Sequence, residues 1–143
     1  MRNKAYLPVA LRREVATDSD DRCGYCLTPQ EYTGIELVHD HIIPESLGGK
    51  TVRENLWLAC RRCNQHKYTR TEGVDPITQQ TVPLYNPRTQ SWSVHFVWSE
   101  TGTEIVGVTP IGRATVKALK MNNHVVVKAR AHWVRWDWHP PKD

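Results

Sequence analysis

Two Cys-x-x-Cys pairs constrain this chain more than any other feature. Cys23 and Cys26 form the first pair, Cys60 and Cys63 form the second, and no cysteine is left over among the 143 residues. A Cys-x-x-Cys turn presents two thiolates from one tight loop, and two such turns complete the tetrahedral four-thiolate site that zinc prefers. The gap between the pairs is wider than in a plain zinc ribbon. We therefore predict a structural Zn²⁺ site that closes a long loop, in preference to two disulfides or unrelated thiols.

Composition and charge indicate the cellular compartment and the kind of partner to expect. A reducing cytosol favours metal over disulfide for paired Cys-x-x-Cys motifs, so we expect a cytoplasmic, intracellular protein. The first residues, Met1 to Ala5, carry charge without a hydrophobic stretch behind them, which disfavours a secretory signal. The formal net charge is +4 and the pI is about 9.0, values that fit a nucleic-acid partner.

Local patterns predict the following elements between the termini of the chain. In the N-terminal half they are a helix over 8–19, a strand over 35–39 that delivers Asp40 and His41, a strand over 56–59, and a helix that begins at the second cysteine pair and ends by Gly73. In the C-terminal half, the patterns predict a turn-rich linker over 73–90, followed by a strand over 92–98 that forms a hairpin with residues 104–108. A helix is predicted to begin at Thr109-Pro110. The segment over 125–138 fits either a strand or a helix.

The loop between the cysteine pairs carries polar residues in a specific order. Cys23-Gly24-Tyr25-Cys26 is followed by His39-Asp40-His41-Ile42-Ile43-Pro44, Gly48-Gly49, Asn55-Leu56 and Cys60-x-x-Cys63-Asn64-x-x-Lys67. In identity, order and spacing this pattern resembles the HNH endonuclease motif, and more narrowly the branch in which four cysteines hold a zinc ion. The resemblance covers about residues 20–70.

The resemblance implies an α+β fold with a small zinc-stabilised ββα-metal (His-Me finger) core and an α/β C-terminal extension. Carried over position by position, Asp40 and Asn64 are the expected ligands of a divalent ion and His41 is the expected general base. Asn55 is expected to hold the loop that orients His41. The third position of the motif is Asn instead of His, and such an oxygen-rich site suits Mg²⁺ or Mn²⁺ over Zn²⁺.

The chemistry of phosphodiester hydrolysis supports these roles. A neutral imidazole can take a proton from water near pH 7, and a divalent ion stabilises the charge that builds on the phosphate. Asp40 and Asn64 supply two protein oxygens, and water and phosphate can complete the octahedron that Mg²⁺ requires. Because neighbours in a strand point to opposite faces, we expect a bend or a strand end at Asp40 and His41.

The helix after the second cysteine pair is expected to have a basic edge. The cations predicted to contact nucleic acid there are Arg61, Arg62, Lys67 and Arg70. Charges of this kind position the phosphate backbone without reading its sequence.

We interpret the chain as three segments: an N-terminal helix or arm over 1–22, a zinc-clamped HNH core over 23–72 and a hairpin plus helical extension over 73–143. The expected activity is metal-dependent hydrolysis of DNA phosphodiesters, with double-stranded DNA as partner and no membrane association. One site cuts one strand, so a monomer would nick, and a double-strand break would need a homodimer or two events. The first alternative is a non-catalytic, zinc-dependent module that binds nucleic acid. The second is an interaction protein whose exposed tryptophans bind a partner.

Overall fold

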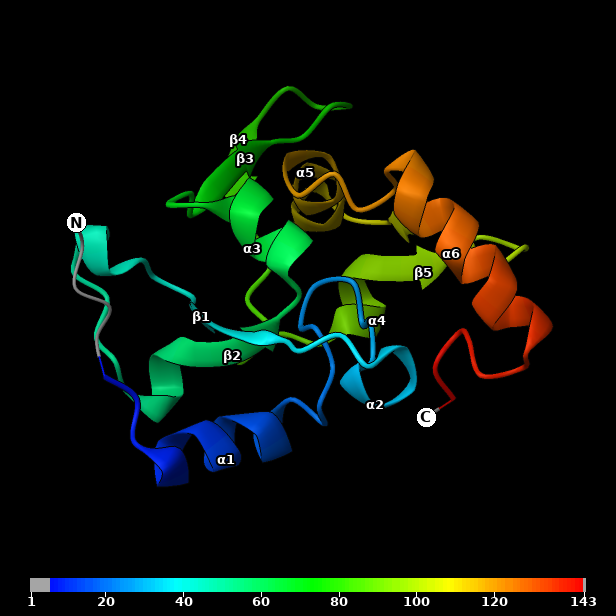
Figure 1. Ribbon diagram of the computed structural model, residues 1–143. Helices are drawn as coiled ribbons and strands as arrows, with labels where there is room; N and C mark the ends of the chain where they lie inside the picture. The colour runs from blue at the N-terminus through cyan, green and yellow to red at the C-terminus, as the bar shows by residue number, and fades with distance from the viewer. Residues whose placement is uncertain (1–5, 143) are drawn as a thin grey trace. The chain divides into compact units, whose positions relative to one another are not determined.

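A computed structural model describes residues 6–142; residues 1–5 and 143, including the start of the predicted arm, lie outside the described residues. Two compact units are present (Figure 1). The first comprises the described residues up to Thr71 together with Asn86–Arg88, and the second comprises Glu72–Tyr85 and the described residues from Thr89 on. Within this range no helix is long and apolar enough to cross a membrane.

A short antiparallel hairpin followed by a helix forms the centre of the first unit. β1 (Val38–His41) pairs with β2 (Leu56–Ala59), and α3 (Arg61–Lys67) follows β2 directly. α1 (Val9–Asp18) packs against β2, and α3 packs against β1 (Figure 1). The remaining elements are single turns: α2 (Gln30–Thr33), η1 (Glu45–Leu47) and η2 (Arg53–Asn55). The order of strand, strand and helix confirms the predicted α+β core.

The strand predicted over 35–39 begins three residues later than expected. The backbone N–H of Leu37 donates to Oε1 of Gln30 at 2.9 Å, and that of Ile35 donates to the Thr33 hydroxyl at 3.1 Å. These side chains use the backbone donors that a strand would need for pairing, so the ladder starts only at Val38.

The helix predicted from the second cysteine pair ends at Lys67, well before Gly73. Tyr68 caps it with φ 51° and ψ −120°, which is outside the helical region. The helix thus ends at Lys67, a residue whose side chain is buried inside the first unit.

Asp18, at the end of α1, forms ion pairs with two arginines of the first unit. Arg53 donates to both of its carboxylate oxygens, at 2.9 and 2.8 Å, and Arg88 donates to Oδ2 at 2.9 Å. The hydrogen bonds from Arg53 and the charge of Arg88 lower the pKa of Asp18 to about 2. Arg88 also donates to the carbonyl oxygen of Leu56 and lies over the Trp57 ring, 4.8 Å from its centroid. The segment 86–88 is therefore part of the hairpin's support.

The predicted linker over 73–90 is wrong, because most of it is a hairpin of the second unit. β3 (Glu72–Val74) pairs with β4 (Thr81–Pro83). The buried carboxylate of Asp75 closes the turn between them by accepting hydrogen bonds from the backbone of Ile77 and Thr78. Arg113 donates to both oxygens of Asp75 at 2.8 Å, which ties the hairpin to the following helix region. The glycine and proline residues of this segment are equally typical of a hairpin turn and of a linker, so they did not reveal the hairpin.

The predicted strand over 92–98 is wrong in its first half. α4 (Trp92–His95) is one helical turn, and only Phe96–Trp98 (β5) pairs, with Ile105–Gly107 (β6). The turn brings the Trp92 ring to 5.1 Å from Phe96 and 5.5 Å from Trp98, between ring centroids. Contact four residues along the chain is natural for a helical turn and not for an extended strand.

Two helices complete the second unit. α5 (Pro110–Ala118) starts as predicted, with the Thr109 hydroxyl accepting the N–H of Gly112 at 3.0 Å. The ambiguous segment is α6 (His124–Arg135), capped by Asn123. Its Arg130 is fully buried and donates to the carbonyl oxygens of Met121 and Thr103. Because a charged residue lies on the buried face of this helix, the pattern of polar and apolar residues did not distinguish the helix from a strand.

Gly112 allows a close approach between α5 and the β5–β6 hairpin. A Cβ at this position would collide with the carbonyl oxygen of His95 and lie 3.3 Å from Cα of Gly107. Both neighbours are backbone atoms, which cannot move aside as the end of a side chain can. Glycine is therefore required here by packing.

We expect Gly112→Ala to lower the free energy of unfolding by about 1–3 kcal/mol, the usual cost of overpacking. The sign is informative, because alanine is by itself the better helix former by about 1 kcal/mol. Urea unfolding followed by tryptophan fluorescence measures the change. Lys117→Ala, an exposed change on the same helix, is the matched control, and equal stability of the two variants would contradict the close approach.

Candidate functional site

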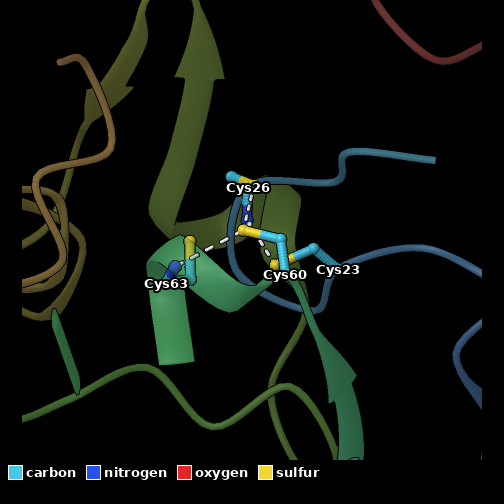
Figure 2. A group of neighbouring side chains, drawn as sticks. All are labelled: Cys23, Cys26, Cys60 and Cys63. Carbon is cyan, nitrogen blue, oxygen red and sulfur yellow. Dashed lines mark hydrogen bonds between the residues drawn. The ribbon is translucent and has the colours of Figure 1, made fainter. Parts of the chain in front are cut away.

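The four cysteines come together in the first unit. Their sulfur atoms all lie within 4.8 Å of one another, and all four residues are buried and free of disulfides (Figure 2). Cys60 is the N-cap of α3 and Cys63 lies in its first turn, whereas Cys23 and Cys26 come from the loop after α1. This gathering confirms that the four cysteines are positioned to bind a metal ion.

Backbone N–H groups and an arginine lie close to the cysteine sulfur atoms, where they would stabilise negatively charged thiolates. The N–H of Cys26 points to Sγ of Cys23 at 3.5 Å, and the N–H of Cys63 points to Sγ of Cys60 at 3.4 Å. The guanidinium of Arg62 lies 3.9 Å from Sγ of Cys26. Burial raises the pKa of the Cys23 thiol, since a thiolate without a counter-charge is costly in an apolar interior. Four thiolates at this place therefore require a cation.

The first cysteine pair is fastened to β2. The N–H of Gly24 donates to the carbonyl oxygen of Leu58 at 2.8 Å, and a Cβ on Gly24 would collide with the Trp57 ring. The N–H of Cys23 donates to the Thr28 carbonyl oxygen at 3.0 Å. The turn is thus held against β2, the strand that leads directly into Cys60.

Asp40 faces α3 and is almost completely enclosed, with 4% of its surface exposed. The Tyr25 hydroxyl donates to its Oδ2 at 2.9 Å, and Nζ of Lys67 lies 3.3 Å from each carboxylate oxygen. Lys67, itself 2% exposed, also donates to the carbonyl oxygen of His41 at 3.0 Å. Burial raises the pKa of Asp40, and the charge of Lys67 opposes that shift. Asp40 is therefore a buried carboxylate with its own counter-ion.

His41 is the last residue of β1, at the strand end that the sequence required. Its Nε2 lies 2.9 Å from the Thr51 hydroxyl and 3.6 Å from Oε1 of Glu45. His39, two residues earlier, instead contacts the carbonyl oxygen of Arg12 in α1 at 3.2 Å. The two histidines of this strand thus have different partners, and Thr51 was not anticipated from the sequence, since a lone loop threonine carries no distinguishing pattern.

Asn55 is bonded to the loop that follows His41. Its Oδ1 accepts the N–H of Ile43 at 2.8 Å, and its Nδ2 donates to the carbonyl oxygens of Ile43 at 3.0 Å and Lys50 at 2.9 Å. A Cβ on Gly49 would collide with the Ile43 carbonyl oxygen, so the loop closes tightly on itself. These contacts fix both ends of the segment from Ile43 to Lys50, which includes Glu45.

Asn64 lies on α3, one turn before Lys67. Residues three apart in a helix share a face, so Asn64 lies on the side of α3 from which Lys67 reaches Asp40. Its side chain is half-buried. The contacts of Lys67 thus place this face of α3 beside Asp40 and the backbone of His41.

The four cations predicted to contact nucleic acid divide into two kinds. Arg61 and Arg70 are exposed. Arg62 is half-buried against Cys26, and Lys67 is enclosed with Asp40. Arg62 and Lys67 thus contact groups inside the unit, and the contact of these four cations with nucleic acid stays a prediction. Tyr25 also acts there, a role that its place between two cysteines did not reveal.

Comparisons with known proteins agree with this geometry. The family model described as HNH endonuclease matches residues 23–70, about a third of the chain. The chain is also similar to a protein of Corynebacterium diphtheriae named CRISPR-associated endonuclease Cas9, with 45% identity over 47 residues. That match covers 32% of this chain and 4% of the relative, so the likeness concerns one small part of a much longer protein.

No solved structure matches this chain. The family match covers the two cysteine pairs, β1, η2, β2 and α3, and these four elements carry Asp40, His41, Asn55 and Asn64. Residues 23–70 thus match the HNH endonuclease family, and the four gathered cysteines are consistent with the zinc-clamped branch of that family.

Proposed function

We propose that this protein is a metal-dependent endonuclease that hydrolyses DNA phosphodiester bonds, one strand at a time. The observation that supports the proposal is the hairpin and helix of residues 38–67, in which Lys67 of α3 contacts Asp40 and the backbone of His41 inside the segment that matches the family. The relative from C. diphtheriae is named an endonuclease, which supports the same activity.

His41 is proposed as the general base. Nε2 of His41 is engaged with the Thr51 hydroxyl at 2.9 Å, and the negative charge of Glu45, 3.6 Å away, favours a proton on that nitrogen. Nδ1 then keeps its lone pair and can take a proton from an attacking water. Asn55 acts through the loop, since the segment it holds carries Glu45.

Asp40 and Asn64 are the proposed ligands of Mg²⁺ or Mn²⁺. A carboxylate and an amide oxygen are hard donors, which these ions prefer. An ionised carboxylate has about four lone-pair sites, so the hydrogen bonds from Tyr25 and Lys67 leave Asp40 able to bind an ion. When bound, such an ion would stabilise negative charge on the phosphate and on the leaving oxygen. The charge of Lys67 favours the ionised form of Asp40, against the effect of burial on its pKa.

Zn²⁺ is the proposed occupant of the four-cysteine cluster, in a structural role. Four thiolates fill the tetrahedral shell of zinc and leave no open position for substrate. The cluster joins the loop after α1 to the start of α3, so its metal would stabilise the fold and not react. An intracellular, reducing setting that keeps the thiols free is part of this proposal.

Duplex DNA is the proposed substrate, held by phosphate contacts from exposed cations such as Arg61 and Arg70. A single site of this kind would produce nicks from a monomer. The alternative is a module that binds nucleic acid without cutting it, and the enclosure of Asp40 by Lys67 is the observation that favours it.

Supercoiled plasmid distinguishes these two functions. We expect wild-type protein to convert it to open circles when Mg²⁺ or Mn²⁺ is added, and not after dialysis against buffer without divalent ions. His41→Ala should lower the rate by about 10²–10⁴-fold, the usual contribution of a general base. His39→Ala, a histidine two residues away on the same strand, should cut at a rate close to that of the wild type. DNA that is shifted on a gel but never cut, in either ion, would establish the binding module instead.

Removal of zinc should unfold the first unit. We expect about one zinc ion per purified chain by atomic emission spectroscopy, as a four-thiolate site requires. A strong zinc chelator should abolish cooperative thermal unfolding, because metal binding supplies much of the folding free energy of such sites. Dialysis against buffer without Mg²⁺ is the control and should leave the melting temperature unchanged. A metal-free chain that melts like the parent would disprove the structural role.

Asn55→Ala tests whether the loop from Ile43 to Lys50 contributes to cleavage as well as to stability. Three hydrogen bonds to the loop are lost, so we expect the free energy of unfolding to fall by about 1–3 kcal/mol. Cleavage should fall as well, measured at a temperature where the variant is fully folded, because His41 loses the segment that carries Glu45. Glu54→Ala, an exposed neighbour, is the control, and a folded Asn55→Ala protein with wild-type cleavage would remove Asn55 from the site.

A further inference from the structure

A ladder of aromatic rings lies at the C-terminal end of the second unit. Trp133 and Trp138 are stacked, with ring centroids 5.2 Å apart and planes at 26°. Trp136 stacks on Trp138 at 6.2 Å and 23°, and His132 lies 6.1 Å from Trp136 at 31°. Rings arranged in nearly parallel planes offer flat faces at the end of the ladder, unlike the edge-to-face pairs that fill most cores.

The inner end of this ladder is closed and the outer end is open. Trp133 contacts the buried ring of His139, with centroids 5.5 Å apart. At the other end, His132 and Trp136 are both exposed, and 62% of Trp136 is open to solvent. A large aromatic residue held in place by two neighbouring rings, yet mostly open to solvent, is a preformed platform for another flat ring, because its own orientation is already fixed.

The charges beside the platform are positive. Lys128, His132 and Trp136 follow one another at intervals of four residues and therefore share one side of the α6 region, and Arg135 adjoins them. Both Lys128 and Arg135 are exposed, and α6 contains no acidic residue. The nearby Asp137 is offset by Lys142, whose Nζ lies 3.4 Å from its carboxylate. A ligand with a flat ring and a negative charge matches this surface.

We infer that Trp136, with Arg135 and Lys128, binds single-stranded DNA, with an unpaired base stacked on the indole and the neighbouring phosphates near the two cations. Stacking on aromatic side chains beside positive charge is the general way in which unpaired nucleic acid is held without sequence preference. The two exposed cations, together with an α6 that contains no acidic residue, favour a negatively charged strand over a protein partner. The choice of DNA over RNA rests on the proposed function, whereas binding itself requires no cleavage.

The test compares a fluorescently labelled oligothymidylate with an abasic sugar-phosphate strand of the same length, by fluorescence anisotropy. The full chain is used with His41→Ala in the background, and gels check that the probe stays intact. We expect the dissociation constant for oligothymidylate to be roughly tenfold lower than for the abasic strand, as stacking of a base on an aromatic residue implies. Trp136→Ala should abolish that difference, and Trp136→Phe should retain most of it.

Val125→Ala is the matched control, because Val125 is 64% exposed on the same helix but lies at its other end; its binding should equal that of the parent. Equal affinity for both probes, or a folded Trp136→Ala protein that still prefers bases, overturns the inference. Tighter binding of oligouridylate than of oligothymidylate overturns the choice of DNA. A protein that nicks plasmid yet shows no preference for bases keeps the proposed nuclease and loses this site.

Discussion

The geometry of the first unit depends on the four-cysteine cluster. It joins the loop after α1 to the junction where β2 ends and α3 begins, so it determines the direction in which α3 leaves the hairpin. Asn64 and Lys67 follow Cys63 within little more than one helical turn, and their positions depend on that direction. The first unit has a small apolar core, and a metal ion held by these cysteines would replace part of what a larger core provides.

Charge is balanced locally throughout this unit. Lys67 accompanies the enclosed Asp40, Arg62 lies beside a cysteine sulfur, and Asp18 is held by two arginines. A carboxylate buried without such a partner would take up a proton instead of remaining ionised. Lys67 therefore opposes the effect of burial on the pKa of Asp40 and favours the charged form that a divalent ion needs.

Local signals in the sequence were sufficient for β2, for the start of α3 and for the Thr109 cap, because each depends on residues adjacent in the chain. They were insufficient where a distant side chain decides the outcome. Gln30 delays β1, and Arg113 converts an apparent linker into a hairpin. In the candidate site, spacing identified the cysteines and the family resemblance identified Asp40 and His41. The partners Tyr25 and Thr51, and the burial of Lys67, follow from tertiary packing that no spacing encodes.

The return of the chain to the first unit at Asn86–Arg88 has a practical meaning for dissection of this protein. Arg88 contacts Asp18, the Leu56 carbonyl oxygen and the Trp57 ring, although the residues on both sides of this segment belong to the second unit. A fragment that stops at Thr71 would contain every cysteine and every proposed catalytic residue, yet it would leave the outer face of β2 without its arginine. The boundaries of the family match therefore do not mark a part that can be excised intact.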